Sequence, residues 1–167
     1  MTGATIPDPS DTARALRTAL ASYPTGVVAL AAEVDGQRVG MAVNSFTSIS
    51  LDPALVAVRV ARTSRTWPQL AVADRIGLSV LAAHQESVSR RLSARDGDRF
   101  GDVELHHADG GALLVEGAAL WLQAEPHTTL DGGDHEIVLL KIVEVAHFDR
   151  VEPLVFHRSR YGAVLAS

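Results

Sequence analysis

Residues 39–60 read VGMAVNSFTSISLDPALVAVRV, a short polar segment that leads into a strongly apolar one. Hydroxyl or amide side chains occupy five of the seven positions 44–50, namely Asn44, Ser45, Thr47, Ser48 and Ser50. Side chains of this kind usually bond nearby backbone in turns, which favours a polar connection between two strands. Phe46 and Ile49 interrupt them, however, and LVAVRVA at 55–61 has the alternation and β-branching of a buried strand. A polar segment this close to a core needs hydrogen-bond partners.

Outward from this stretch, strand patterns dominate the chain. Apolar runs predict strands in GVVALAA at 26–32, RVGMAV at 38–43 and RIGLSVLA at 75–82. The dipeptide Asp35-Gly36 predicts a tight hairpin turn between the first two of these strands. After residue 111, three or four more strands follow between glycine-rich turns, which gives about seven in all.

Helix patterns are fewer. Asp11 can cap a first helix, in which Leu16, Leu20 and Tyr23 share one face. Pro68 fits the first turn of a second, short helix, and HQESVSRRLSA at 84–94 predicts a third. Two or three helices beside about seven strands predict a mainly β protein, an antiparallel barrel with flanking helices, rather than alternating βαβ units.

Composition limits the classes of function. A chain of 167 residues with 47% hydrophobic and 21% charged residues predicts one globular domain over residues 11–167, after a flexible N-terminal arm at residues 1–10. The net charge of -5 and the scattered basic residues disfavour nucleic acid and anionic membranes as partners. With no apolar run near 18 residues and no leader pattern, we expect a cytoplasmic protein. The absence of cysteine excludes disulfides, thiolate nucleophiles and iron-sulfur clusters.

Standard catalytic motifs are missing from the sequence. No GxGxxG or Walker loop indicates a nucleotide fold, and no GxSxG indicates a hydrolase elbow. His106 and His107 are adjacent, but no two histidines have the i, i+4 spacing of a metal site, so no metal is predicted.

Four polar segments at strand ends or turns remain: VNSFTSIS at 43–50, ARTSRTWP at 61–68, GDRF at 97–100 and GGDHEI at 132–137. If these loops converge, they supply the hydroxyl and guanidinium donors that a phosphate monoester needs. Those donors are Ser45, Arg62, Ser64, Arg65, Thr66 and Arg99. Simpler interpretations stay open, since Ser64 or Thr66 can cap a helix and His135 can be a solvated turn residue. Trp67 and Trp121 are expected in the core.

In their order and spacing, these segments resemble the flavin reductase family with the FMN-binding split β-barrel fold, the small reductase components of two-component flavin-dependent monooxygenases. The resemblance covers nearly the whole chain. It rests on Pro-Thr-Gly-Val at 24–27, Gly40-x-x-x-Asn44-Ser45-Phe46-x-Ser48-x-Ser50-x-x-Pro53, Ser64-x-Thr66, Asp98-Arg99-Phe100, Gly133-Asp134-His135-x-Ile137 and His157-x-x-x-Tyr161. It implies a mainly β, antiparallel split barrel of the Greek-key type with two or three flanking helices.

The resemblance also implies the activity and its residues. NADH or NADPH would reduce FMN, or FAD, and the reduced flavin would supply a partner monooxygenase, with the reductase itself a homodimer. His135 would position the nicotinamide as the catalytic residue, with His157 and Tyr161 on the same side. The implied flavin-binding residues are Thr25, Val43, Asn44, Ser45, Ser48, Ile49, Ser50, Arg62, Ser64, Thr66, Arg99 and Phe100.

Three positions depart from the family pattern. Ala42 stands where the family often has threonine or serine, and Leu140 and Ser159 stand where it commonly has glycine. We expect Ala42 to weaken flavin binding, and the other two to reshape the nicotinamide side. Two alternatives therefore remain: a flavin-binding barrel protein with another electron acceptor or no turnover, and a non-enzymatic binding module. Flavin-dependent oxidation of NADH would separate the reductase from both.

Overall fold

The structure, a computed structural model, describes residues 9–164, so residues 1–8 of the predicted arm lie outside the described range. Three α-helices are present in that range, as expected, together with one 3₁₀ turn. They are α1 Pro9–Leu20, α2 Trp67–Leu70, α3 Glu86–Leu92 and η1 Asp109–Gly111. Helix α1 begins two residues before Asp11, so residues 9 and 10 are helical. Within residues 9–164, no helix is both long and apolar enough to cross a membrane.

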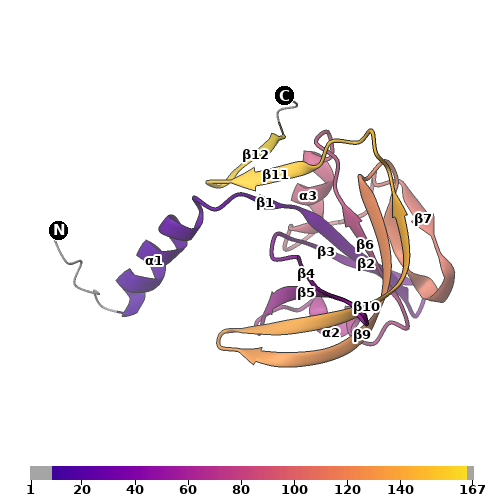
Figure 1. The fold of residues 1–167 in the computed structure, drawn as a ribbon, viewed down its shortest axis with the longest axis horizontal. Helices are drawn as coiled ribbons and strands as arrows, with labels where there is room; N and C mark the ends of the chain where they lie inside the picture. Colours follow the sequence, from indigo (N-terminus) through magenta and orange to yellow (C-terminus); the bar gives the residue numbers. More distant parts are fainter. Residues whose placement is uncertain (1–8, 165–167) are drawn as a thin grey trace.

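Seven strands form one antiparallel sheet in the order β3-β2-β6-β9-β10-β5-β4. They are β2 Val28–Val34, β3 Gln37–Val43, β4 Thr47–Leu51, β5 Ala54–Ala61, β6 Ile76–Val80, β9 Leu120–Gly132 and β10 His135–His147. This sheet curls on itself on the right of Figure 1, while α1 projects away from it on the left.

The two edges of the sheet explain why it curls. The edge strands β3 and β4 follow each other in the chain and are separated only by residues 44–46. A chain advances at most about 3.6 Å per residue, so the end of β3 lies within roughly 14 Å of the start of β4. The sheet must therefore bend until its edges approach each other, and in the described chain no ladder pairs them. We call residues 44–46 the seam of the barrel, and they begin the polar segment at 44–50.

Strand β2 shows where the core lies. Val28, Leu30 and Ala32 belong to one buried cluster, and Ala29 and Ala31 belong to a second. Because successive side chains of a strand point to opposite faces, β2 is covered on both sides, inside the barrel and outside it. The continuous apolar run at 26–32 follows from this double burial, which confirms the prediction of a buried strand.

Two small sheets complete the fold. One has the order β1-β11-β12 and the other pairs β7 with β8. Their strands are β1 Thr25–Gly26, β7 Leu105–His107, β8 Leu113–Val115, β11 Leu154–His157 and β12 Arg160–Ala163. The described chain thus has twelve strands, so the prediction of about seven was too low, because short strands of two to four residues have too little periodicity to be recognised.

Turn chemistry was more predictable than strand number. Val34 pairs with Gln37, and the two residues between them, Asp35 and Gly36, have φ of 50° and 73°. A two-residue loop with positive φ at both positions is the hairpin turn that the Asp-Gly dipeptide favours. The predicted hairpin is therefore confirmed, as is the mainly β, antiparallel barrel with three helices.

Candidate functional site

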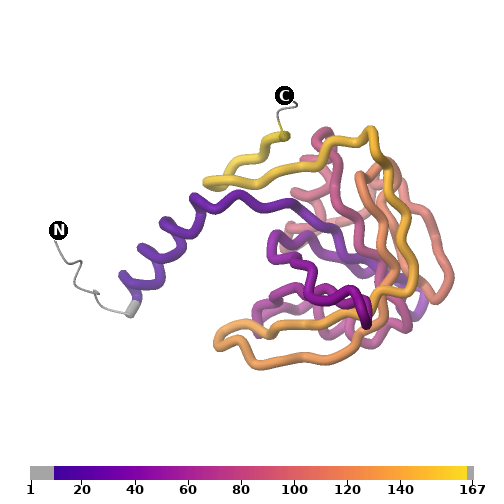
Figure 2. Tube along the Cα trace, viewed as in Figure 1, coloured from indigo at the N-terminus to yellow at the C-terminus, as the bar shows by residue number. Residues whose placement is uncertain are grey.

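A cavity of about 320 Å³ opens beside the seam. The buried side chains of Val27, Val43 and Val60 form its apolar floor. Polar and charged residues complete its walls, namely Asn44, Ser45, Arg59, Ser89, Ser93, His135 and Tyr161. In Figure 2 these residues belong to segments far apart in the sequence, coloured from indigo to yellow. A volume above roughly 300 Å³, with an apolar floor and a few polar groups, is typical of a small-molecule site.

Ser45 fixes the position of the seam through two hydrogen bonds. The Ser45 hydroxyl accepts a hydrogen bond from the Arg59 N–H at 2.9 Å and donates one to the Arg59 carbonyl at 3.0 Å. Arg59 lies on β5, so this pair of bonds ties the seam to the barrel wall and engages the Ser45 hydroxyl within the protein. Val43 and Asn44 line the cavity beside it. The predicted flavin-binding residues Ser48, Ile49 and Ser50 lie on β4 and are not part of this lining.

Arg62, directly after β5, fixes the tip of the β9-β10 hairpin. Its Nε donates to the Gly133 carbonyl at 2.8 Å, Nη2 to Asp131 at 2.7 Å and Nη1 to Glu136 at 3.2 Å. A backbone hydrogen bond from Gly133, followed by the Arg62 hydrogen bond and charge, holds the pKa of Asp131 below its usual range. All three nitrogens of Arg62 are thus engaged by the hairpin, and this geometry does not support the predicted flavin contact of Arg62.

His135 is the first residue of β10 and lines the cavity from that hairpin. Its Nδ1 lies 2.7 Å from an Asp134 carboxylate oxygen, and its side chain is 39% exposed. The hydrogen bond and charge of His135 hold the pKa of Asp134 below its usual range. A lowered pKa means that the carboxylate partner is present at neutral pH and is lost only as the pH falls through that lowered value. The remaining ring nitrogen, Nε2, makes no hydrogen bond within the described chain.

Three of the six residues predicted to bind phosphate, Arg65, Thr66 and Arg99, line a second cavity, of about 430 Å³. Arg99 Nη1 donates to the Thr66 hydroxyl at 2.8 Å and to the Gly40 carbonyl at 2.9 Å. These bonds join the loop before Phe100 to β3 and to the start of α2. The structure therefore brings Thr66, Arg99 and Phe100 together, but not with Ser45.

Two predicted hydroxyls have other surroundings. The Ser64 hydroxyl accepts a hydrogen bond from the Trp67 N–H at 3.1 Å at the start of α2, which agrees with the interpretation of Ser64 as a helix cap. The Thr25 hydroxyl is enclosed and has no hydrogen-bond partner in the described chain. Neither residue lines either cavity. Trp67 is buried in the core, as expected.

The C-terminal hairpin of β11 and β12 carries two residues predicted for the nicotinamide side, and one of them lines the first cavity. Tyr161 lines the first cavity, with its hydroxyl 2.9 Å from that of Ser89 and its ring under the Arg90 guanidinium at 5.0 Å. His157 Nε2 lies instead 3.1 Å from the Ser22 carbonyl, outside that lining. His157 therefore ties β11 to the segment after α1.

The three departures from the family pattern have different locations. Ala42 lines the first cavity. Leu140 is fully buried among core residues and does not line the first cavity, so it has no direct contact with the nicotinamide side of that cavity. Ser159 lies in the turn between β11 and β12 with φ of 60°, and Arg158 beside it has φ of 49°. Glycine adopts this left-handed backbone more easily than either residue does.

Sequence reasoning missed several lining residues. Ser89 and Ser93 line the first cavity from the third helical stretch, and their i, i+4 spacing places them on one helix face. Phe156, which packs on Tyr161 with ring centroids 5.1 Å apart, was read only as part of a strand. The serine spacing was a usable signal, whereas nothing local in the sequence marked Phe156.

The first cavity fits a flat aromatic ligand with polar edges. Its valine floor can cover the face of a ring system, while the amide, hydroxyl and imidazole groups on the walls can bond the edges of that ring system or a second ligand stacked on it. Such residues fit the flavin that the sequence resemblance implies. Within residues 9–164, no group of three acidic or histidine side chains is arranged to hold a metal ion.

Comparison with known proteins gives a consistent picture. A family model described as a flavin reductase like domain matches residues 20–165. A flavin reductase from Pseudomonas putida is 37% identical over 151 residues, which make up 90% of this chain and 89% of that protein. The reductase subunit of a flavin-dependent monooxygenase from Rhodococcus jostii is 30% identical over 90% of this chain and 77% of its own length.

Solved structures agree with the sequence comparisons. An NADH:FAD oxidoreductase from Streptomyces globisporus, solved in complex with NAD and FAD fragments, superposes on this chain with a TM-score of 0.88 at 31% identity. The superposition covers 97% of this chain and 98% of that one. The likeness thus extends over the whole barrel, both small sheets and the helices.

Proposed function

The chain belongs to the flavin reductase like domain family, and we propose that it is an NAD(P)H-dependent flavin reductase that supplies reduced flavin to a partner monooxygenase. It is an oxidoreductase. We further propose that its electron donor is NADH or NADPH, that it reduces FMN or FAD, and that it works in the cytoplasm, where such nucleotides are available.

One observation carries this proposal: the cavity at the seam combines a valine floor with His135 on its wall. A flavin accepts a hydride from reduced nicotinamide when the two rings are stacked, so a reductase must hold one ring and leave space for the other. Val27, Val43 and Val60 would support the flavin ring, and Asn44 would bond its edge. The chain contributes orientation rather than a chemical reagent.

His135 would orient the nicotinamide. It lies at the tip of a hairpin that Arg62 holds by three hydrogen bonds, and Asp134 holds its Nδ1. The free Nε2 is then available to bond the donor. Arg62 would then have a positioning role, because its three guanidinium nitrogens are bonded to the hairpin.

The proposal is tested by measuring oxidation of NADH and NADPH with FMN, FAD, riboflavin or no added flavin. We expect oxidation that depends on added flavin, together with quenching or a shift of flavin fluorescence on binding. Flavin binding without oxidation of either nucleotide would instead favour the barrel protein with another acceptor. No binding and no oxidation would leave only the non-enzymatic module.

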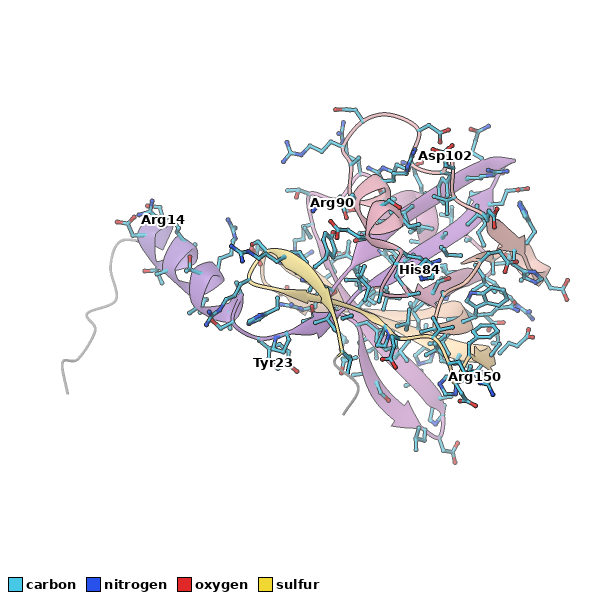
Figure 3. All side chains as sticks on the ribbon, turned by 90° about the horizontal axis from the view of Figure 1, so that it is seen from above. Arg14, Tyr23, His84, Arg90, Asp102 and Arg150 are labelled. Atoms are coloured by element: carbon cyan, nitrogen blue, oxygen red, sulfur yellow. The ribbon has the colours of Figure 1, made fainter. Side chains whose placement is uncertain are left out.

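We also propose that the protein is a homodimer, with the exposed helix α1 in the contact between copies. Leu16 and Leu20 on this helix are 55% and 61% exposed, and Tyr23 after it is 74% exposed. Figure 3 shows α1 projecting from the barrel, with Arg14 near its far end and Tyr23 at its base. A helix of 12 residues is marginal in water by itself, since isolated helices need roughly 12–15 residues even to begin to be stable. Packing against a second copy would stabilise it.

The dimer gives a direct prediction. Light scattering at micromolar concentration should report twice the mass of one chain, and replacing Leu16 and Leu20 by glutamate should halve it, because charge then replaces the apolar contact. Val72→Glu is the matched control, since Val72 is also exposed, at 70%, but lies beyond α2. A monomeric parent, or a glutamate double variant that stays dimeric, would contradict the proposed contact.

A further inference from the structure

Strand β12 is the edge strand of the small sheet that contributes Phe156 and Tyr161 to the first cavity. In the described chain it pairs only with β11, whereas β11 also pairs with β1. Within residues 9–164, Tyr161 is the only residue of β12 whose side chain hydrogen-bonds an element outside this hairpin. Its partner is Ser89 on α3, and Figures 1 and 3 both place α3 beside the yellow strands of the hairpin. Helix α3 therefore fixes the hydroxyl end of Tyr161.

Ser89 carries a buried hydroxyl at the wall of the first cavity. The residue is only 2% exposed, and it lines that cavity. Its Oγ lies 2.9 Å from the Tyr161 hydroxyl oxygen, and this hydroxyl makes no other hydrogen bond to residues 9–164. A buried hydroxyl reaches little water, so it needs a partner within the protein. The bond to Tyr161 supplies that partner.

The two hydroxyls can arrange their hydrogen atoms in two ways. If Tyr161 donates to Ser89, the Ser89 hydrogen has no acceptor in the described part of the chain. If Ser89 donates to Tyr161, the Tyr161 hydrogen is left for the first cavity, where a ligand or solvent can accept it. A buried donor without an acceptor is unfavourable, so the second arrangement is preferred. Tyr161 therefore presents an O–H donor to the cavity.

The ring of Tyr161 is held on two sides. The Phe156 ring lies 5.1 Å away between centroids, and the Arg90 guanidinium lies over the Tyr161 ring at 5.0 Å from its centroid. Arg90 is itself held by Glu86, one turn earlier on α3, to which its Nε donates at 2.7 Å. A cation over an aromatic face is attracted to the ring, so Arg90 and Phe156 limit its rotation. Ring and hydroxyl are thus both in place before a ligand arrives.

The valine floor and Asn44, where the flavin is proposed, belong to the barrel, whereas Tyr161 comes from the small sheet. A donor there suits the second ring, since the carboxamide of nicotinamide carries a carbonyl oxygen that accepts a hydrogen bond. We propose, on the basis of the proposed function, that Ser89 is a positioning residue of the reductase. By bonding Tyr161, it directs the phenol O–H to the carboxamide oxygen of the nicotinamide.

The test compares Ser89→Ala, Tyr161→Phe and the double variant in steady-state kinetics with the better of NADH and NADPH, and in flavin titration. Tyr161→Phe should raise KM for the nicotinamide about fivefold, the scale of one neutral hydrogen bond, and Ser89→Ala should raise it at least about twofold. In both, kcat should change less than about twofold and the dissociation constant of flavin should stay the same. The double variant should match Tyr161→Phe, because Ser89 acts through the phenol.

Ser87→Ala is the matched control, since Ser87 is exposed on the same helix and lines neither cavity. It should leave KM unchanged. Tyr161→Phe keeps the ring and its contacts, so it tests the hydroxyl even where Ser89→Ala does not fold.

An unchanged KM in Tyr161→Phe would overturn the inference. So would a Ser89→Ala effect that persists in the Tyr161→Phe background, because Ser89 would then act by itself. Weaker flavin binding in Tyr161→Phe would overturn it in favour of a hydrogen bond to the flavin. If the parent oxidises neither nucleotide with any flavin, the proposed function fails as well, whereas an active parent whose variants match it contradicts this inference alone.

Discussion

Replacing His135 by alanine is expected to lower kcat/KM for the nicotinamide more than tenfold while leaving the dissociation constant of flavin unchanged. The physical reason is geometric, since a hydride donor displaced by about 1 Å can lose on the order of 100-fold in rate. His135 lies on the wall of the first cavity, whereas the valine floor that would hold flavin does not depend on it. Steady-state kinetics with varied NADH and NADPH, combined with flavin titration, measures the two effects separately.

The same strand offers a control for this prediction. His147 lies at the other end of β10 and has a similar partner, with its Nδ1 2.9 Å from Asp149. His147→Ala removes an equivalent histidine-aspartate pair far from the cavity and should leave both measurements unchanged. If His135→Ala leaves kcat/KM unchanged, the residue is an ordinary turn histidine. A parallel loss of flavin affinity would mean that the hairpin supports the flavin instead.

The largest effect on stability is expected for Gly77→Ala. Gly77 lies on β6, and an added Cβ would be 2.1 Å from the Leu113 carbonyl oxygen and 2.7 Å from its carbon. Both are backbone atoms of β8, which crosses β6 at this point, so no side-chain rotation relieves the contact. Overpacking in a core usually costs about 1–3 kcal/mol, and a backbone clash belongs at the upper end of that range. Urea unfolding should show the free energy of unfolding reduced by about 3 kcal/mol.

Gly162→Ala provides the matched comparison for the strand glycine. Gly162 lies on β12, and an added Cβ there has no atom within 4 Å. This substitution should change the free energy of unfolding by less than about 1 kcal/mol, in either direction. A Gly77→Ala protein as stable as the Gly162→Ala protein would show that β8 can move away from β6 without loss.

The hairpin and the seam show how far sequence reasoning reaches. The Asp35-Gly36 turn is encoded in two adjacent residues, so its prediction needed no knowledge of the rest of the chain. The polar segment after β3 was recognised as unusual, and its order relative to the other motifs identified the family. Its role in closing the barrel depends on which strands become edges, and that follows from the pairing of all seven strands.

The arginines of the candidate site show the same difference between what is local in the sequence and what depends on the fold. Arg62 was expected to help bind a phosphate, but it bonds Asp131, Glu136 and Gly133, which are about 70 residues away in the chain. Arg65, three residues later in the chain, and Arg99 instead line the second cavity. Composition and spacing predict which groups are present, whereas only the fold shows which of their hydrogen bonds are already made.

The small sheet beside α1 has a consequence for how the protein is made. Strand β1 pairs with β11, and Arg158 and His157 bond the backbone carbonyls of Ala21 and Ser22. The segment around residue 25 therefore has its partners only when the segment around residue 160 has been made. A ribosome makes about 5–20 residues per second, so β1 has no partner for several seconds after it emerges. Phe156 and Tyr161 are made after every other residue that lines the first cavity. The lining of the first cavity is therefore complete only after β11 and β12 have been made.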